Sequence, residues 1–245
     1  MAQERVTIGT EDGACPCQLF TPEQGEGPWP AIIVYMDAGG IRPTISDISQ
    51  RLAEAGYLVL LPDLFYRYGP YGPFVPKEVF AADFRKVLGP LMATTDNLKA
   101  AADTGALLAY LDTRDDVAGS KVGAVGFCLG GGMAIAAAGT WPERFAAVAS
   151  FHGGRLATDE PTSPHLLAPR IKAELYIAAA ENDDSYPQEM ADRFEAALVE
   201  AGVRYHAETY PAAHGWMKPD IPVYDHEQAE RGWSAMLALF QRALT

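Results

Sequence analysis

The chain has 245 residues, of which 49% are hydrophobic and 21% are charged, an ordinary composition for a globular protein with a sizeable core. Its 19 basic and 32 acidic residues give a net charge of −13, which argues against nucleic-acid binding and means that an anionic substrate would need a local cationic patch. Its apolar runs are too short to span a bilayer and none begins the chain, so we expect a cytoplasmic protein with no membrane partner and no signal peptide, as a monomer or small homo-oligomer.

Two of the three cysteines, Cys15 and Cys17, flank Pro16 near the start of the chain. We interpret them as small side chains of an N-terminal strand, and the odd count fits a reducing cytoplasm. No second pair of cysteines completes a zinc site, and neither a His-Glu-x-x-His motif nor a histidine pair at ligand spacing is present. The sequence therefore predicts neither a metal nor a cofactor.

From residue 31 onward, short apolar runs alternate with segments of helical periodicity. The predicted strands are Ala31–Met36, Tyr57–Leu61, Lys121–Gly126, Ala146–Phe151, Glu174–Ala180 and Tyr205–Tyr210. The predicted helices run from near Ser46 to Gly56, and over Asp96–Leu111, Leu129–Ala138, Gln188–Ala201 and Asp225–Leu244. This alternation predicts one α/β domain over residues 1–245, with a mostly parallel central sheet and helices on both faces.

Residues 64–76 interrupt this alternation with a run of aromatic residues, glycines and prolines that predicts an irregular segment. The segment follows the carboxyl end of a predicted strand, which is where open α/β sheets bind ligands. Two interpretations stay open, a loop that lines a pocket and a loop that only packs on the surface.

The most informative segment is the strand that runs straight into Gly126-Phe127-Cys128-Leu129-Gly130, followed by an alanine-rich helix. This Gly-x-Cys-x-Gly pattern is typical of a nucleophile elbow, a sharp turn that exposes the reactive side chain above the sheet. The helix N-terminus would favour a thiolate and offer backbone N–H groups to an oxyanion. We therefore interpret Cys128 as the nucleophile.

This turn has two other interpretations. A glycine-rich turn between strand and helix can bind phosphate, but the glycines here do not give Gly-x-Gly-x-x-Gly, and no Gly-Lys-Ser/Thr follows. A free cysteine is most often a buried structural residue, and this remains an alternative interpretation of Cys128.

An acid and a base follow the nucleophile in the order that α/β-hydrolases use. The loop after the predicted strand Glu174–Ala180 contains Asp183 and Asp184, and we take Asp183 as the acid and Asp184 as the near alternative. His214 lies in a loop after the next strand, Tyr205–Tyr210, and is our candidate base.

The other four histidines fit the role of base less well. His206 lies within a predicted strand, His226 within a helical pattern and His165 in a proline-rich segment. His152 precedes the acid, which is the wrong order, but it closes a strand and could line the pocket.

At this point the sequence resembles the dienelactone hydrolase family, a cysteine-nucleophile branch of the α/β-hydrolases, from about Ala31 to the C-terminus. The matching parts are Gly126-Phe127-Cys128-Leu129-Gly130-Gly131, Leu61-Pro62-Asp63-Leu64, Asp183 to Pro187, and Ala213-His214-Gly215. The resemblance implies a triad of Cys128, Asp183 and His214. Pro187, four residues after Asp183, matches the family spacing and favours Asp183 over Asp184.

The resemblance also implies further site residues. The backbone N–H groups of Ala38 and Leu129 would form the oxyanion hole. Asp37 stands where the family has a glutamate that pairs with the resting thiol. Lys218 and, in a gapless reading, Arg85 stand at or near the positions of two arginines that hold a substrate carboxylate. Lysine lacks the bidentate guanidinium fork, so the dienelactone substrate itself is less strongly implied than the fold.

These observations predict a hydrolase that cleaves a small carboxylic ester or lactone through an acyl-enzyme on Cys128. The best substrate class would be a dienelactone-like lactone that carries a carboxylate. Two alternatives stay open: thioester or peptide cleavage at the same site, and a binding or scaffold protein without catalysis.

Overall fold

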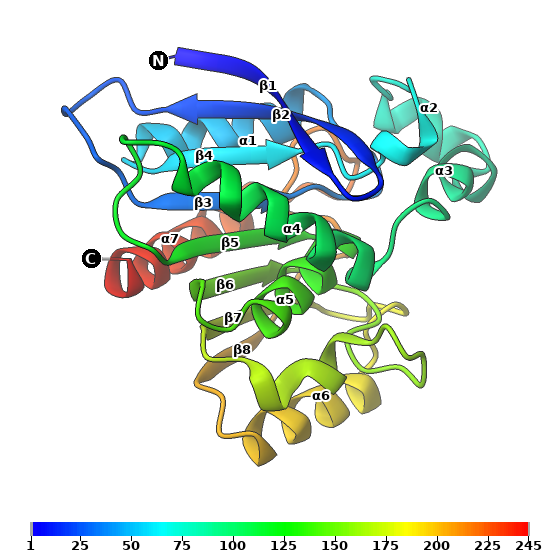
Figure 1. The fold of residues 1–245 in the computed structure, drawn as a ribbon. Helices are drawn as coiled ribbons and strands as arrows, with labels where there is room; N and C mark the ends of the chain where they lie inside the picture. Colours follow the sequence, from blue (N-terminus) through cyan, green and yellow to red (C-terminus); the bar gives the residue numbers. More distant parts are fainter. Residues whose placement is uncertain (1, 245) are drawn as a thin grey trace.

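The computed structural model describes residues 2–244 and contains one eight-stranded sheet of order β1-β2-β4-β3-β5-β6-β7-β8 (Figure 1). Every pairing from β4 to β8 is parallel, and both pairings of β2 are antiparallel. The strands are β1 Ala2–Thr10, β2 Gly13–Thr21, β3 Ala31–Tyr35, β4 Leu58–Pro62, β5 Val122–Phe127, β6 Phe145–Phe151, β7 Glu174–Ala180 and β8 Tyr205–Tyr210.

Helices cover both faces of this sheet: α4, α5 and α6 lie on the near face in Figure 1, and α1 and α7 lie behind it. The helices are α1 Pro43–Glu54, α2 Pro76–Ala81, α3 Phe84–Met92, α4 Asn97–Asp112, α5 Leu129–Thr140, α6 Gln188–Glu200 and α7 His226–Ala243, with short 3₁₀ helices η1 Tyr66–Tyr68 and η2 Pro164–Arg170. The predicted α/β architecture is confirmed, and no helix among residues 2–244 is long and apolar enough to cross a bilayer.

The core lies between the sheet and its helices. Strands β3, β4 and β5 are buried along their whole length, as expected for strands covered on both faces. The predicted N-terminal strand is also present, because Cys15 and Cys17 lie side by side in β2, both buried, with Sγ atoms 3.9 Å apart.

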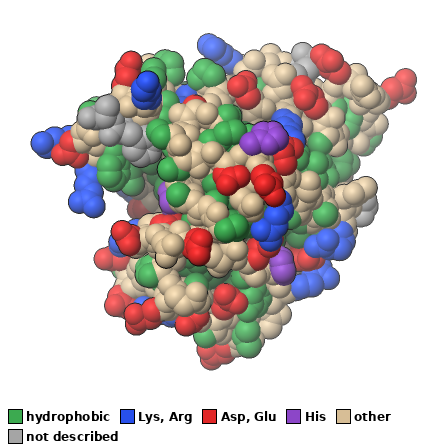
Figure 2. All heavy atoms as spheres, turned by 180° about the vertical axis from the view of Figure 1, so that it is seen from behind, with side chains coloured by type: hydrophobic (Ala, Val, Ile, Leu, Met, Phe, Trp, Pro, Cys, Tyr) green, Lys and Arg blue, Asp and Glu red, His purple; other side chains and the backbone are tan. Residues whose placement is uncertain are grey.

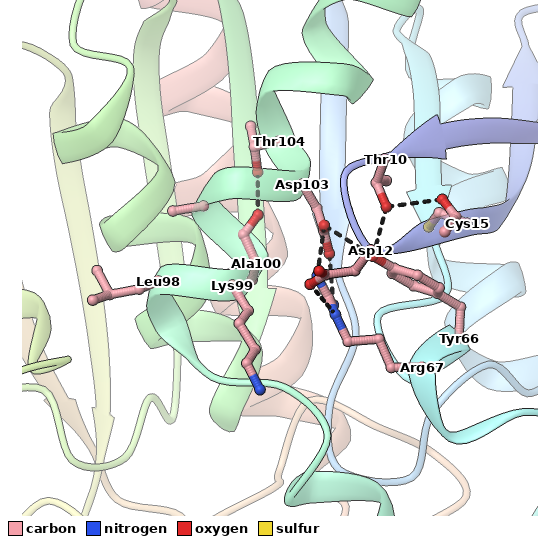
Figure 3. A network of polar contacts seen from close by, with 12 residues as sticks. Thr10, Asp12, Cys15, Tyr66, Arg67, Leu98, Lys99, Ala100, Asp103 and Thr104 are labelled. Carbon is pink, nitrogen blue, oxygen red and sulfur yellow. Dashed lines mark hydrogen bonds and ion pairs between the residues drawn. The ribbon is translucent and has the colours of Figure 1, made fainter.

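The segment after β4 is more ordered than the sequence predicts, because residues 66–68 form the single turn η1 where we expected no regular structure. Arg67 donates to both carboxylate oxygens of Asp103 on α4, at 2.8 and 2.9 Å, and to Asp12 in the turn between β1 and β2 (Figure 3). The Tyr66 hydroxyl donates to Asp103 and shares a hydrogen bond of 2.6 Å with the Thr10 hydroxyl. These contacts fasten the turn to two distant parts of the chain.

Farther along the same segment, Tyr71 packs on the turn that follows β3. Its hydroxyl donates to Asp63 at 2.6 Å and accepts from the backbone N–H of Ile41 at 3.1 Å. Its ring lies so close to Gly40 that a Cβ there would come within 2.6 Å. Tyr71 thus packs this segment against the turn that precedes α1, and the sequence shows no pattern that predicts the contact.

Replacing Arg67 with Met should lower the free energy of unfolding by roughly 3 kcal/mol, because it leaves the buried Asp103 carboxylate without its cation. Urea unfolding followed by circular dichroism would measure this loss. Arg193→Met is the matched control, since Arg193 pairs with the exposed Asp159 and should cost under about 1 kcal/mol. Equal losses in the two variants would show that the buried pair contributes no more to the free energy of unfolding than the exposed pair.

Candidate active site

The nucleophile candidate sits at a sharp turn between β5 and α5. Cys128 has a φ of 56°, a left-handed backbone conformation that non-glycine residues rarely adopt. The turn requires glycine on either side: a Cβ on Gly126 would lie 2.0 Å from the carbonyl oxygen of Gly130, and one on Gly130 would lie 2.3 Å from that of Tyr35. The two glycines therefore let strand, helix and β3 meet closely enough to push the Cys128 side chain outward.

The backbone of Cys128 is fixed from the neighbouring strand. Its N–H donates both to the carbonyl oxygen of Phe151, at 3.0 Å, and to Nδ1 of His152, at 3.2 Å. Burial holds the pKa of His152 well below its ordinary value, so this imidazole is neutral and Nδ1 can accept. His152 is fully buried beside His214, with ring centroids 4.9 Å apart, and its hydrogen bond with the Cys128 N–H stabilises the turn.

The acid and base candidates meet at the carboxyl ends of β7 and β8. Nδ1 of His214 lies 2.6 Å from Oδ2 of Asp183, while Oδ1 of Asp183 accepts from the backbone N–H and the hydroxyl of Ser185 at 2.8 and 2.6 Å. Asp183 is buried and Asp184 is exposed. The structure thus brings Asp183 to His214 and leaves Asp184 in solvent.

Cys128 and His214 form a hydrogen-bonded pair whose pKa values are shifted in opposite directions. Burial alone would raise the pKa of the Cys128 thiol, but the hydrogen bond and charge of His214, followed by the charge of Lys218, outweigh it and lower that pKa. Burial alone would lower the pKa of His214, yet its hydrogen bonds to Asp183 and Cys128 raise it to about 10. Both shifts favour a thiolate–imidazolium pair over a neutral thiol and imidazole.

Asp37 lies close enough to raise the thiol pKa by its charge, but its carboxylate is occupied. Oδ1 accepts from Gly39 N–H at 2.8 Å and from Arg42 at 2.6 Å, and Oδ2 accepts from Arg42 at 3.0 Å and pairs with Lys218 at 2.6 Å. A carboxylate has about four acceptor positions, so none is left for the thiol. The pairing of Asp37 with the thiol that the resemblance implies is therefore replaced by a buried ion network.

The two residues proposed to hold a substrate carboxylate lie in very different places. The Lys218 side chain is only 2% exposed and is committed to Asp37. Arg85 is exposed near the start of α3, with its guanidinium 5.8 Å from the ring centre of Phe84. Neither position offers a free cation beside Cys128 in this structure.

The oxyanion-hole candidates lie at the right elements for that role. Ala38 begins the turn after β3 and Leu129 is the first residue of α5, and both are half-buried. In the chain from residue 2 to residue 244, neither N–H has a protein acceptor. Both N–H groups are thus free to receive a developing negative charge.

Three polar residues of the site were missed by sequence reasoning. Arg42 binds Asp37 and also Asp220, at 2.6 Å, and so ties the turn after β3 to the segment after His214. Ser185 orients Asp183 through an Asp-x-Ser turn, which the sequence could have indicated. The pairing of Arg42 with Asp220 spans residues far apart in the chain, and no local pattern reveals it.

No group of three His, Cys, Asp or Glu within the described chain could hold a metal ion.

Replacing His214 with Asn should shift the pH at which Cys128 becomes alkylated to above the ordinary thiol value near 9.0, since burial, the largest effect on the thiol pKa, is then opposed only by the charge of Lys218. In the unaltered protein the inflection should lie below that value, and the imidazolium should persist until the pH approaches about 10. Iodoacetamide labelling across pH, read by peptide mass spectrometry, measures both. His206→Asn, at an exposed position on β8, is the control. The same inflection in all three proteins would contradict the ion pair.

Replacing Asp37 with Asn should lower the free energy of unfolding by about 3 kcal/mol, because the buried Lys218 loses its counter-ion. It should also lower the pKa of Cys128 further, since a nearby negative charge is removed. Denaturant unfolding and the alkylation profile test the two effects. Asp112→Asn, which removes an exposed partner of Arg144, should cost under about 1 kcal/mol. A stable Asp37→Asn protein with a raised thiol pKa would refute the network.

Comparisons with known proteins show which family the chain belongs to. Residues 16–244 match the model of the Dienelactone hydrolase family. The chain is 30% identical over 241 residues to the Escherichia coli (strain K12) protein named "Putative carboxymethylenebutenolidase", covering 96% of this chain and 85% of that one. A crystal structure titled "Putative Dienelactone Hydrolase" from Klebsiella pneumoniae superposes with a TM-score of 0.86 at 25% identity and covers 98% of both chains. A dienelactone hydrolase-like promiscuous phosphotriesterase from metagenomic libraries shares the fold at 24% identity, with a TM-score of 0.77 over the full length of both chains. The chain belongs to the dienelactone hydrolase family and is a hydrolase of that enzymatic family.

Proposed function

We propose that this hydrolase cleaves a small carboxylic ester or lactone by nucleophilic catalysis at Cys128. The observation that carries the proposal is the 2.6 Å contact between Asp183 and His214 beside a cysteine held at a strained strand-to-helix turn. The proposed nucleophile, acid and base follow the carboxyl ends of β5, β7 and β8, so all three lie at the same end of the parallel strands.

In the first half of the reaction the Cys128 thiolate attacks the carbonyl carbon, and the carbonyl oxygen takes the negative charge. The N–H groups of Ala38 and Leu129 stabilise that oxyanion. The carbon–oxygen bond of the ester then breaks, and the leaving alkoxide takes the proton from Nε2 of the His214 imidazolium. The product is a thioester on Cys128, to which the new hydroxyl stays tethered when the substrate is a lactone.

In the second half His214, now neutral, takes a proton from a water molecule, which attacks the thioester. The tetrahedral intermediate collapses, the Cys128 thiolate leaves, and the carboxylic acid is released. Asp183 holds Nδ1 of His214 throughout, which keeps Nε2 directed at the reacting atoms. The lowered pKa of Cys128 favours a preformed thiolate, which can attack without a prior proton transfer.

The alternatives differ in measurable ways. Thioester or peptide cleavage would use the same residues but favour other leaving groups, so competition between a thioester and a lactone separates them. A binding protein without catalysis would have no need of a low thiol pKa, and the lowered pKa of Cys128 favours an enzyme.

We further propose that the protein acts in a reducing compartment such as the cytoplasm, on a small molecule and not on nucleic acid. The adjacent thiols of Cys15 and Cys17 are unbonded at 3.9 Å, and the net charge of −13 disfavours polyanions.

Replacing Cys128 with Ala should abolish turnover of a dienelactone, followed by the loss of its ultraviolet absorbance, because no thioester can form. Cys17→Ala removes a buried thiol far from the proposed chemistry, and its turnover per folded protein should stay near that of the unaltered chain. Circular dichroism would confirm that both variants are folded. Turnover that survives in Cys128→Ala would overturn the assignment of the nucleophile.

A further inference from the structure

The segment that follows β6 contains a second residue in a strained backbone conformation. Arg155 has a φ of 56°, and its backbone N–H donates to the carbonyl oxygen of Ser185 at 2.7 Å. Gly154 packs so tightly on the same loop that a Cβ there would come within 2.7 Å of the Ser185 hydroxyl. Since Ser185 also binds Asp183, the backbone of Arg155 is fixed directly against the loop of the triad acid. Conformations of this kind cost about 1–3 kcal/mol and concentrate at functional positions.

Beside this segment lies a cavity of about 220 Å³ that reaches the nucleophile turn. Its walls include Leu129, which directly follows Cys128, together with Met133 on α5 and Asn97 at the start of α4. Gly154 and Arg155 form another part of the wall. The cavity is therefore adjacent to both the proposed oxyanion donor and the strained arginine.

The charges around the cavity leave Arg155 available for a ligand. Asp96 is used as the cap of α4, since its carboxylate accepts from the N–H groups of Leu98 and Lys99 at 2.9 and 2.8 Å. The Arg155 side chain is exposed and makes no ion pair with any residue from 2 to 244. Glu160 also borders the cavity but lies beyond ion-pair distance of Arg155. An exposed guanidinium at a cavity wall is well suited to bind a carboxylate in a bidentate manner.

The other cations near the nucleophile are already committed. Lys218 and Arg42 are both buried, and both bind Asp37. A protein with a net charge of −13 repels anions at long range, so an anionic substrate needs a free local cation. Among the described residues, Arg155 is a free cation on the wall of the cavity that Leu129, the residue after Cys128, also lines.

We propose that Arg155 is a specificity-determining residue that binds a carboxylate on the acyl part of the substrate within this cavity. The acyl part is favoured because the leaving group must lie near His214, which protonates it, and His214 does not line the cavity. The inference rests on the proposed function and adds to it a preference for esters or lactones of dicarboxylic acids. Glu160 opposes this preference through its like charge.

A matched pair of substrates tests the preference: the mono-4-nitrophenyl ester of glutaric acid and the same ester with its free carboxylate capped as a methyl ester. Arg155→Met should lower kcat/KM for the anionic ester roughly tenfold, the worth of a charged hydrogen bond, and leave the capped ester within about twofold. Arg155→Glu should lower it further, and Glu160→Gln should raise it. Arg170→Met, at an exposed arginine outside the cavity, and Arg85→Met should change neither substrate. An equal loss on both esters, or an anionic preference that disappears in Arg85→Met and not in Arg155→Met, would overturn the proposal.

A second measurement separates this inference from the proposed function, because it needs no turnover. Glutarate should protect Cys128 from iodoacetamide in the unaltered protein, and the concentration for half-protection should rise about tenfold in Arg155→Met but not in Arg170→Met. Protection without hydrolysis of either ester would refute the hydrolase and keep the subsite. Hydrolysis without any Arg155-dependent protection or selectivity would refute the subsite and keep the hydrolase.

Discussion

The close approach of β5, α5 and β3 is the constraint on which the site depends. Only glycine fits at 126 and 130, because any side chain there would enter the backbone of the facing segment. That approach forces Cys128 into a left-handed conformation, which is held by two acceptors on its N–H group. The strain points the thiol away from the sheet and towards His214, and it places the first N–H groups of α5 where an oxyanion would form. The same close approach thus determines both the local backbone and the position of the Cys128 thiol.

A second level of organisation comes from buried charge. Asp37 binds two cations, and Arg42 carries the network on to Asp220, in the segment after the triad histidine. Such a network is weak evidence for stability, since the cost of desolvating each ion offsets much of the attraction, but losing one partner leaves a charge stranded. Its position suggests a different use. By occupying every acceptor of Asp37, it leaves the thiol to pair with His214, and this pairing lowers the pKa of the nucleophile before substrate arrives.

The sequence predicted the parts of this molecule that depend on local pattern. Buried strands such as Ala31–Tyr35 show as continuous apolar runs, and the elbow shows as glycines two residues either side of Cys128. Other features depend on contacts between distant segments and leave no such pattern. The short turn at Tyr66 is held by Asp103 and Thr10. Helices α2 and α3 were not predicted, since α2 has only six residues and α3 contains Pro90, a residue that usually breaks a helix. Asp37 differs from its expected role because Arg42 and Lys218 bind its carboxylate.

The central claim is that Cys128 carries the acyl group during turnover. Rapid acid quenching of the enzyme with an ester substrate, followed by intact-mass and peptide mass spectrometry, tests it most directly. The account predicts that the protein gains the mass of the acyl group, that the group maps to the peptide containing Cys128, and that it accumulates when His214 is replaced by Asn, because deacylation needs the base. An enzyme that turns over while its mass never changes, or that carries the acyl group on another residue, would contradict it.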